Sequence, residues 1–401
     1  MKIKNGVLLS VAIVLASCSN TSENEGGSGR DPDLQTVAAK AMVAANNEFA
    51  LKLFNEVAST EAAENYMVSP LSVSLALGMT YNGADGTTAT EFGNVLGYTD
   101  VAAANSFNQK LITSLTASDS GAKLDLAQAI WIQDDFPVEQ DFVEANQTHY
   151  DAEVANLDFL SSNAVNIVNN WAYDHTNGKI EDFVEGFDAR TVLFLANALY
   201  FKGTWKYEFD PNDTNDGPFY TANATEQTPM MYLNATVPYF VGDMFSSIIL
   251  PYKNDRYQMM VFLPNEGLTT NDIVSEFNIA NLNAWLETYI EGELDINLPR
   301  FKMEYENELT DELVNLGLET AFSESADFSK INKDAALLIS KVIHKTFIEV
   351  NEEGTEAAAV TGVQIELTSV GPSFVANRPF LYMIRDGFTG SICFMGQVGK
   401  P

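Results

Sequence analysis

The residue types that most often carry chemistry in proteins are sparse in this chain and are not arranged as catalytic sites. Its three histidines are His149, His175 and His344, and none of them lies in an H-E-x-x-H sequence or near a cysteine. This spacing argues against a zinc site. No G-x-S-x-G elbow, Walker loop or G-x-G-x-x-G sequence follows a strand pattern. We therefore expect no metal, no cofactor and no enzymatic reaction, with a hydrolase of unknown type as the alternative.

The chemistry that the N-terminus does indicate is lipid attachment to a thiol. A short basic region precedes an apolar run over residues 6–16, which is too short to span a bilayer. The run ends in the sequence LASC, which resembles the lipobox of bacterial lipoproteins, with Cys18 as the lipidated residue. This predicts a signal peptide over residues 1–17. We expect an exported chain that is lipid-anchored to the bacterial cell envelope, at the outer membrane or cell surface, or else secreted.

The alternative for this segment is an ordinary signal peptide in which the cysteine is incidental. The chain has two cysteines, so Cys393 is the only one left once Cys18 carries lipid. No disulfide can then form within the chain, and its stability must come from the core.

The composition of the chain after the expected signal peptide predicts one acidic globular domain. The chain has 55 Asp and Glu against 22 Lys and Arg, which gives a net charge of −33. Such a surface repels phosphate backbones, so we expect no nucleic-acid partner. Residues 19–35 are rich in Ser, Asn, Glu and Gly, which predicts a flexible tether over residues 18–36. Residues 37–401 contain no second linker and no internal repeat, which predicts a single domain.

Hydrophobic periodicity predicts that this domain mixes helices and strands. Helices are expected at Ala38–Val57, Ser69–Met79, Asn105–Leu115, Val138–Tyr150 and Asn307–Leu318. Strands are expected at Thr191–Phe201, Phe245–Leu250, Gln258–Leu263, Leu294–Leu298, Leu337–Val350 and Phe380–Ile384. The order of these elements predicts the α+β class.

The segment after Val350 has the pattern of a strand but is too long for a tight connection. Gly354 supplies a pivot at its start. The alternate residues that follow are small or apolar and uncharged, namely Thr355, Ala357, Ala359, Thr361, Val363 and Ile365. Such alternation is typical of a half-buried strand. An ordinary sheet strand is the alternative, but strands prefer bulkier side chains than residues 357–359 supply. The pattern favours a strand that is exposed at first and inserted later.

Five motifs, in order along the chain, resemble the serpin family. They are residues 65–72 (NYMVSPLS), 194–205 (FLANALYFKGTW), 340–345 (SKVIHK), 352–359 (EEGTEAAA) and 377–380 (NRPF). The resemblance covers about residues 37–401. It implies a serpin fold of three β-sheets with eight or nine helices, and an exposed C-terminal reactive-centre loop at about residues 353–377. It also implies a suicide-substrate inhibitor of serine proteases rather than an enzyme.

The same resemblance assigns the parts of this loop. A serpin loop, once cut by a protease, inserts into the central sheet and distorts the attached enzyme. The hinge that it implies comprises Glu352, Glu353, Gly354, Thr355, Glu356, Ala357, Ala358, Ala359 and Val360. Counting from both ends of the loop puts the reactive bond at Thr368–Ser369, with Leu367 or Glu366 as the alternative P1 residue. A small P1 residue fits elastase-like proteases, and Leu367 at P2 would also suit papain-like cysteine proteases.

Two further clusters are implied where the central sheet opens. The shutter corresponds to Ser69, Ser72, Asn197 and His344, and the breach, where the loop first enters, to Trp205, Arg300 and Glu352. Each has a plainer interpretation as well. His344 is then a hydrogen-bonded core histidine, Trp205 is simple core, and Arg300 with Glu352 is a surface ion pair worth about 0–1 kcal/mol.

The expected partners are serine proteases, elastase-like enzymes above all, with cysteine proteases as a second class. The expected helix Asn105–Leu115 has a single Lys and no Arg, so heparin is not expected to bind. We expect a monomer that touches the membrane only through its N-terminal lipid. The main alternative is a non-inhibitory serpin that serves as a decoy substrate, carrier or chaperone.

Overall fold

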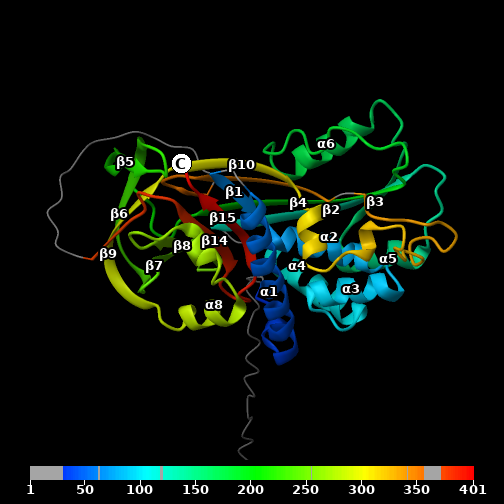
Figure 1. The fold of residues 1–401 in the computed structure, drawn as a ribbon, viewed down its shortest axis with the longest axis horizontal. Coiled ribbons are helices and arrows are strands. Elements are labelled where there is room, and N and C mark those ends of the chain that lie inside the picture. The colour runs from blue at the N-terminus through cyan, green and yellow to red at the C-terminus, as the bar shows by residue number, and fades with distance from the viewer. Residues whose placement is uncertain (1–29, 62–63, 118–120, 254, 341, 356–371) are drawn as a thin grey trace, which may run out of the picture.

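Two hydrogen-bonded β-sheet networks form the frame of the molecule, and helices cover them. The computed structural model describes residues 30–61, 64–117, 121–253, 255–340, 342–355 and 372–401. In Figure 1 a six-stranded network runs across the upper right, with α2 to α5 below it and α6 above it. A nine-stranded network fills the left side, and α1 descends between the two regions.

Nine α-helices are formed within the described residues. They are α1 Val37–Thr60, α2 Pro70–Tyr81, α3 Gly86–Leu96, α4 Val101–Thr116, α5 Gln140–Tyr150, α6 Ala164–His175, α7 Thr270–Val274, α8 Ile279–Leu286 and α9 Thr310–Asn315. Several begin at side chains that satisfy the free N–H groups of the first turn. Thr36 caps α1, Ser69 caps α2 ahead of Pro70, and Asp100 caps α4. None of the described helices is long and apolar enough to cross a membrane.

The six-stranded network has the order β10-β11-β12-β4-β2-β3. Its strands are β10 Phe301–Glu308, β11 Ile343–Val350, β12 Gly354–Thr355, β4 Leu193–Thr204, β2 Ala122–Gln133 and β3 Glu153–Leu157. β2 and β4 form a long antiparallel ladder, and so do β10 and β11. The sheet therefore consists of two well-paired halves, which meet at the two-residue strand β12.

The nine-stranded network has the order β1-β15-β14-β8-β7-β6-β9-β13, and β5 also pairs with β6. Its strands are β1 Asn65–Val68, β15 Ile392–Val398, β14 Phe380–Asp386, β8 Tyr257–Pro264, β7 Phe245–Pro251, β6 Thr225–Val241, β9 Ile290–Pro299, β13 Ser373–Val375 and β5 Asn215–Tyr220. The long strand β6 pairs with β5, then β9, then β7 along its length, so it joins two sheets into one network. Together with the six-stranded network these make the three sheets expected, and the α+β class is confirmed.

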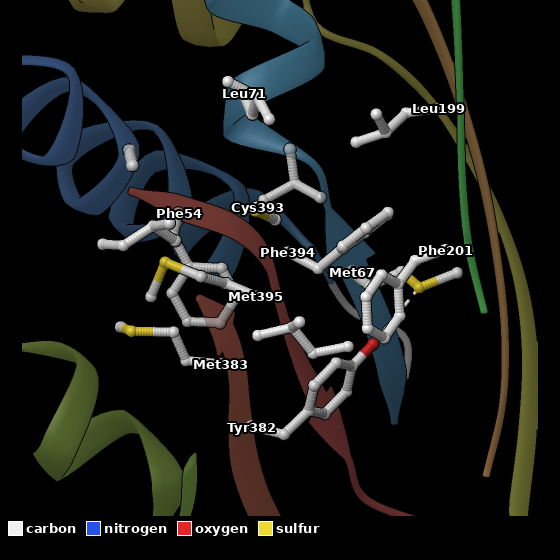
Figure 2. Packing of buried hydrophobic residues seen from close by; sticks show 14 of the residues in the cluster. Phe54, Met67, Leu71, Leu199, Phe201, Tyr382, Met383, Cys393, Phe394 and Met395 are labelled. Atoms are coloured by element: carbon white, nitrogen blue, oxygen red, sulfur yellow. Dashed lines mark hydrogen bonds between the residues drawn. The ribbon is translucent and has the colours of Figure 1, made fainter. Parts of the chain in front are cut away.

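The main core lies where α1 and α2 pack against β14 and β15 (Figure 2). Phe54 of α1 and Met395 of β15 are fully buried there, and the Tyr382 hydroxyl donates a hydrogen bond to the Met67 sulfur at 3.2 Å. Cys393 is a free, buried thiol in the same cluster, and burial raises its pKa. The side chain of this cysteine therefore acts as a small apolar group.

A second, smaller core lies between α6 and the outer face of the six-stranded network. Trp131 of β2 and Trp171 of α6 meet edge to face, with ring centroids 5.3 Å apart. Phe194 of β4 stacks against Trp131, with ring centroids 6.1 Å apart. This cluster holds α6 over β2 and β4, the strands on one side of the junction at β12.

The start of the described chain is docked against the domain. Residues Pro32–Gln35 form a 3-10 helix, Leu34 is 1% exposed, and Lys110 pairs with Asp33 at 2.6 Å. The amide of Gln35 donates to the Phe388 carbonyl. One buried leucine and two polar contacts therefore hold residues 32–35, which lie within the expected tether over residues 18–36, to the body of the domain.

Two expected elements are wrong in extent. A helix was expected at Asn307–Leu318, but β10 continues to Glu308 and α9 covers only Thr310–Asn315. A strand was expected at Leu337–Val350, but β11 begins at Ile343. In both cases apolar residues next to the helix or strand pack on the core but do not belong to that helix or strand. Hydrophobic periodicity alone does not distinguish such flanking residues from residues of the element.

Candidate functional site

The first two residues after the turn that ends β11 already lie inside the six-stranded network. Thr355 pairs with Val350 of β11 on one side and with Gly203 of β4 on the other. Gly354 pairs with Thr204. The expected loop therefore starts as a short strand wedged between β4 and β11.

A tight turn formed by Asn351 aims the chain into this position. Its side-chain oxygen accepts from the N–H groups of Glu353 and Gly354, and its backbone N–H donates to the Gly354 carbonyl at 2.9 Å. Gly354 itself lies so close to β4 that a Cβ atom would collide with the Gly203 carbonyl oxygen. Only glycine fits there, because any side chain would push the chain out of the sheet.

Two stacked aromatic rings form the floor under the turn. Trp205 and Tyr252 lie with centroids 4.4 Å apart and an interplanar angle of 15°, and both are essentially fully buried. The Trp205 indole donates to the Asn351 carbonyl at 2.9 Å, and the Tyr252 hydroxyl is 2.6 Å from the Thr355 hydroxyl. Burial raises the Tyr252 pKa, so its hydroxyl stays protonated. The turn is thus held by directed hydrogen bonds as well as by packing.

Glu352 carries a negative charge at the turn and is held by an ion pair with Arg300, whose side chain is partly exposed. Its side chain is fully buried, accepts from Arg300 Nε at 2.7 and 2.8 Å, and accepts from the Thr214 hydroxyl at 2.5 Å. Burial raises the pKa of this carboxyl, but the hydrogen bonds from Arg300 and Thr214 and the charge of Arg300 outweigh it, so the pKa lies below its usual value. Glu352 is therefore ionised at neutral pH.

Beyond β12, the facing edges of β4 and β11 are not paired with each other in the described residues. Under this region a polar cluster links α2 to both strands. The Ser69 N–H donates to His344 Nε2 at 2.9 Å, and the Ser72 hydroxyl donates to Asn197 Oδ1 at 2.6 Å. The Asn197 Nδ2 atom is buried without a hydrogen-bond partner. α2 thus holds one residue of each strand, and the two strands do not hold each other.

His344 is neutral in this arrangement. Its side chain is 5% exposed and accepts a hydrogen bond from a backbone N–H, and burial lowers its pKa from 6.5 to about 4. Protonation would add a charge in the core and remove the acceptor for Ser69. Ser69 in turn donates through its hydroxyl to the Cys393 carbonyl at 2.8 Å, which ties the cluster to the main core.

The far end of the loop is anchored on another sheet. β13 pairs in parallel with β9, and the Asp295 N–H donates to the Pro372 carbonyl. Arg378 then donates twice to the Pro264 carbonyl, at 2.9 and 2.7 Å. The chain is therefore fixed at Thr355 on one sheet and at Ser373 on the other.

The structure brings the expected shutter and breach residues into two clusters at the places just described. The remaining candidate residues lie outside the described residues, namely Cys18, Glu356, Ala357, Ala358, Ala359, Val360, Glu366, Leu367, Thr368 and Ser369. Sequence reasoning missed Tyr252, Thr214 and Asn351. Their contacts join distant parts of the chain, and no local spacing marks them. In the described part of the chain, no group of three or more His, Cys, Asp or Glu side chains could hold a metal ion.

Comparison with known proteins gives one consistent result. The family model described as Serpin (serine protease inhibitor) matches residues 44–401. Neuroserpin from Gallus gallus is 33% identical over 370 residues, covering 88% of this chain and 90% of its own. The leukocyte elastase inhibitor of Bos taurus is 34% identical, covering 89% of this chain and 99% of its own.

Solved structures agree with this result. The thermophilic serpin tengpin in the native state has a TM-score of 0.82 at 29% identity, covering 90% of this chain and 94% of its own. Thyroxine-binding globulin in complex with thyroxine has a TM-score of 0.83 at 29% identity, covering 90% and 99%. The similarity therefore extends over nearly the whole domain.

We predict that Glu352→Ala destabilises the native protein by about 1–2 kcal/mol, because Arg300 and Thr214 lose their acceptor in a partly exposed pair. The free energy of unfolding from urea titration measures this. Glu353→Ala, at the adjacent and less buried position, serves as the control and should change the value by less than about 0.5 kcal/mol. Equal effects of the two variants would contradict the assigned role of the Glu352 carboxylate.

We predict that acid weakens the native state through His344. Because its pKa is lower in the folded chain than in the unfolded one, the unfolded chain binds the proton first. The contribution of His344 to stability should therefore fall between about pH 6.5 and pH 4, by on the order of 3 kcal/mol, and this contribution should not change further below that. Urea titrations of the parent and of His344→Gln across this range measure it. The difference between the two curves should vary with pH, and a constant difference would refute the assignment.

Proposed function

The chain belongs to the serpin family, and on this basis we propose that it is an inhibitory member, which traps serine proteases as a suicide substrate. The observation that carries the proposal is the position of Gly354 and Thr355 between β4 and β11. These residues begin an additional strand between β4 and β11. In the described residues these two strands, which belong to the two halves of the sheet, are not paired with each other. A loop that starts in this way can continue into the sheet once its other end is released.

The proposed reaction begins as ordinary proteolysis. The protease serine attacks the carbonyl carbon of Thr368, the amine of Ser369 leaves, and an ester joins the loop to the enzyme. The freed loop then inserts antiparallel to β4 and β11. About 15 residues at roughly 3.3 Å each carry the enzyme on the order of 50 Å. Distortion of the enzyme's active site stops hydrolysis of the ester.

The driving force for insertion is the pairing of backbone groups along two open edges. Buried N–H and C=O groups strongly favour hydrogen-bonded partners, and a new central strand satisfies both edges at once. The uncharged alternate residues from Thr355 to Ile365 suit the buried face of such a strand. The uncut protein is then kinetically trapped, because the loop is fixed at Thr355 and at Ser373 and cannot reach the inserted form.

The proposed targets are proteases with shallow specificity pockets. Thr368 as P1 favours elastase-like enzymes, and the similarity to a leukocyte elastase inhibitor supports the same class. Leu367 extends the proposal to papain-like cysteine proteases. A single lysine in α4, Lys110, is already paired with Asp33, which supports action without heparin.

We also propose that the inhibitor works at a cell surface. The signal peptide over residues 1–17 and the cysteine at position 18 support export and lipid attachment in a bacterial envelope, with the domain presented as a monomer. With Cys18 lipidated, Cys393 is the only other cysteine, and it is a free thiol buried in the core. The proposed cell-surface location therefore involves no disulfide within the domain.

A non-inhibitory role remains the second candidate. Thyroxine-binding globulin has been solved in complex with thyroxine, and its fold is as similar to that of this chain as the fold of tengpin is. A carrier or decoy serpin would expose a loop that is cut without trapping the enzyme. The inhibitory and non-inhibitory functions can therefore be distinguished by one observation. Only an inhibitor forms a covalent complex with the protease that survives denaturation.

The experiment is incubation of the protein with leukocyte elastase, followed by denaturing gel electrophoresis and mass spectrometry of the released peptide. A complex that resists SDS, with cleavage at Thr368–Ser369 or one or two residues away, supports inhibition. Cleavage without a complex supports the decoy role and refutes the proposal.

We predict that Thr355→Arg turns the inhibitor into a substrate. Thr355 is 2% exposed between two strands, and burying an unpaired charge there costs several kcal/mol. The uncut protein can avoid this cost by releasing residue 355 from the sheet, whereas the inserted form must bury the charge, so insertion becomes less favourable. A penalty of only about 1.4 kcal/mol on the insertion barrier already shifts the partition toward hydrolysis tenfold. Glu356→Arg, on the opposite face of the alternation, is the matched control and should still inhibit. Circular dichroism must first show that both variants fold. Full inhibition by a folded Thr355→Arg protein would exclude the insertion mechanism.

We predict that cleavage of the loop raises the thermal midpoint by more than about 10 °C. About ten new strand hydrogen bonds at about 1 kcal/mol each contribute on the order of 10 kcal/mol. Differential scanning calorimetry before and after limited proteolysis measures the shift. An unchanged midpoint in the cut protein would show that the uncut form is not metastable.

A further inference from the structure

Two carboxylates meet where the end of α1 packs against α9 and β10, and the insertion mechanism makes no use of them. Glu61 directly follows α1, and Glu312 lies in α9. The side chain of Glu312 is only 4% exposed, and among the described residues no ion pair includes it. A glutamate is rarely buried to this extent without a cationic partner, so this carboxylate calls for an explanation.

The two oxygens of Glu312 differ in their surroundings. Oε1 accepts a hydrogen bond from the Thr60 hydroxyl at 2.9 Å. Oε2 is buried and has no hydrogen-bond partner in the described residues. A buried charged oxygen without a donor is costly, because it has lost its water and gained nothing in exchange. Oε2 is therefore a strong acceptor that the protein itself leaves unused.

Glu61 lies close to Glu312. The Tyr305 hydroxyl of β10 donates to Glu61 Oε2 at 2.5 Å. Burial raises the pKa of Tyr305, and the hydrogen bond to Glu61 and the negative charges of Glu61 and Glu312 raise it further. Both carboxylates thus act on the same hydroxyl group, on one side of which lies the unused oxygen of Glu312.

The end of α1 adds to the negative potential. The last carbonyl groups of a helix carry a partial negative charge, and the last turn of α1 contains no basic residue to offset it. Glu61 is half-buried and Thr60 is exposed, so the cluster reaches the surface on one side. A small cation can enter from solvent, bring water molecules with it, and relieve the repulsion between the two carboxylates.

We propose that Glu61 and Glu312 bind a calcium ion at this junction, with Glu312 Oε2 as its most buried ligand. Calcium takes six to eight oxygen ligands from carboxylates, other protein oxygens and water, in flexible geometry. Magnesium requires a stricter octahedral arrangement, and zinc prefers nitrogen and sulfur. Only two carboxylates take part, so we expect weak binding, in the range of about 0.1–1 mM that is typical of extracellular calcium modules.

The bound ion would join three elements. It would link the end of α1 to α9 through the two carboxylates, and to β10 through the Tyr305 hydroxyl. Tyr305 pairs with Thr346 of β11, so the half of the six-stranded network formed by β10 and β11 would be held more firmly to α1. Calcium should therefore stabilise the uncut protein. This proposal does not depend on protease inhibition.

The test is the thermal midpoint of the uncut protein in EDTA, and then in calcium, magnesium and sodium chloride at equal ionic strength. We expect about 10 mM calcium to raise the midpoint of the parent by about 2–4 °C, and magnesium or sodium to raise it less. Glu312→Gln keeps the volume and removes the charge, so it should lose the calcium-dependent rise. In EDTA this variant should melt at least as high as the parent, because no buried charge is left without a partner.

Glu144→Gln, which removes an exposed carboxylate on α5, is the matched control and should retain the full rise. An equal rise in the parent, the control and Glu312→Gln would mean that calcium acts on the acidic surface in general, and the proposal would be wrong. No calcium-dependent rise in the parent would also refute it, and would indicate that Glu312 is buried in its protonated form.

A second measurement does not depend on the melting of any variant. Terbium, which replaces calcium at oxygen sites, emits when a nearby tyrosine is excited, and Tyr305 is positioned to transfer this energy. We expect terbium emission from the parent that calcium displaces, and a large loss of it in Glu61→Gln as well as in Glu312→Gln. If Glu312→Gln does not fold, Glu61→Gln decides the outcome. Emission that is unchanged in a folded Glu61→Gln protein would exclude the site.

Discussion

The structure depends on one constraint, which is that the facing edges of β4 and β11 carry backbone hydrogen-bonding groups that the two strands do not give each other. Each half of the sheet is a long, well-paired ladder, and among the described residues only β12 pairs with both halves. Open edges of this kind normally recruit another strand. Gly354 and Thr355, the first two residues of β12, occupy that place, and β13 pairs with β9 where the described chain resumes.

The contacts of the turn at residues 351–355 fix where the chain enters the space between β4 and β11. Packing of Trp205 on Tyr252 and hydrogen bonds to Asn351 place the chain at the mouth of the sheet, and the Glu352–Arg300 pair fixes its direction. The energies involved are small, on the order of 1 kcal/mol per contact. In the proposed mechanism, contacts of this size hold the chain while the loop is anchored at both ends and give way to insertion once one end is free.

The sequence by itself determined the α+β class and the family, and it predicts the loop. Five ordered motifs and a run of uncharged alternate residues are local patterns, and local patterns survive in a sequence without its fold. The expected shutter residues, and Trp205 and Glu352 of the expected breach, could be named because the motifs contain them. The limits of the helix near residue 310 and of the strand before Ile343 could not be found, since packing on the core decides them.

Only the tertiary structure decided how these residues work together. It showed that Thr355 lies between β4 and β11, that Thr214 and Tyr252 hold the turn, and that Asn197 and His344 are joined to α2 rather than to each other. These contacts connect segments far apart in the chain. Their formation depends on how the two sheets and α2 pack, and no residue spacing records that arrangement.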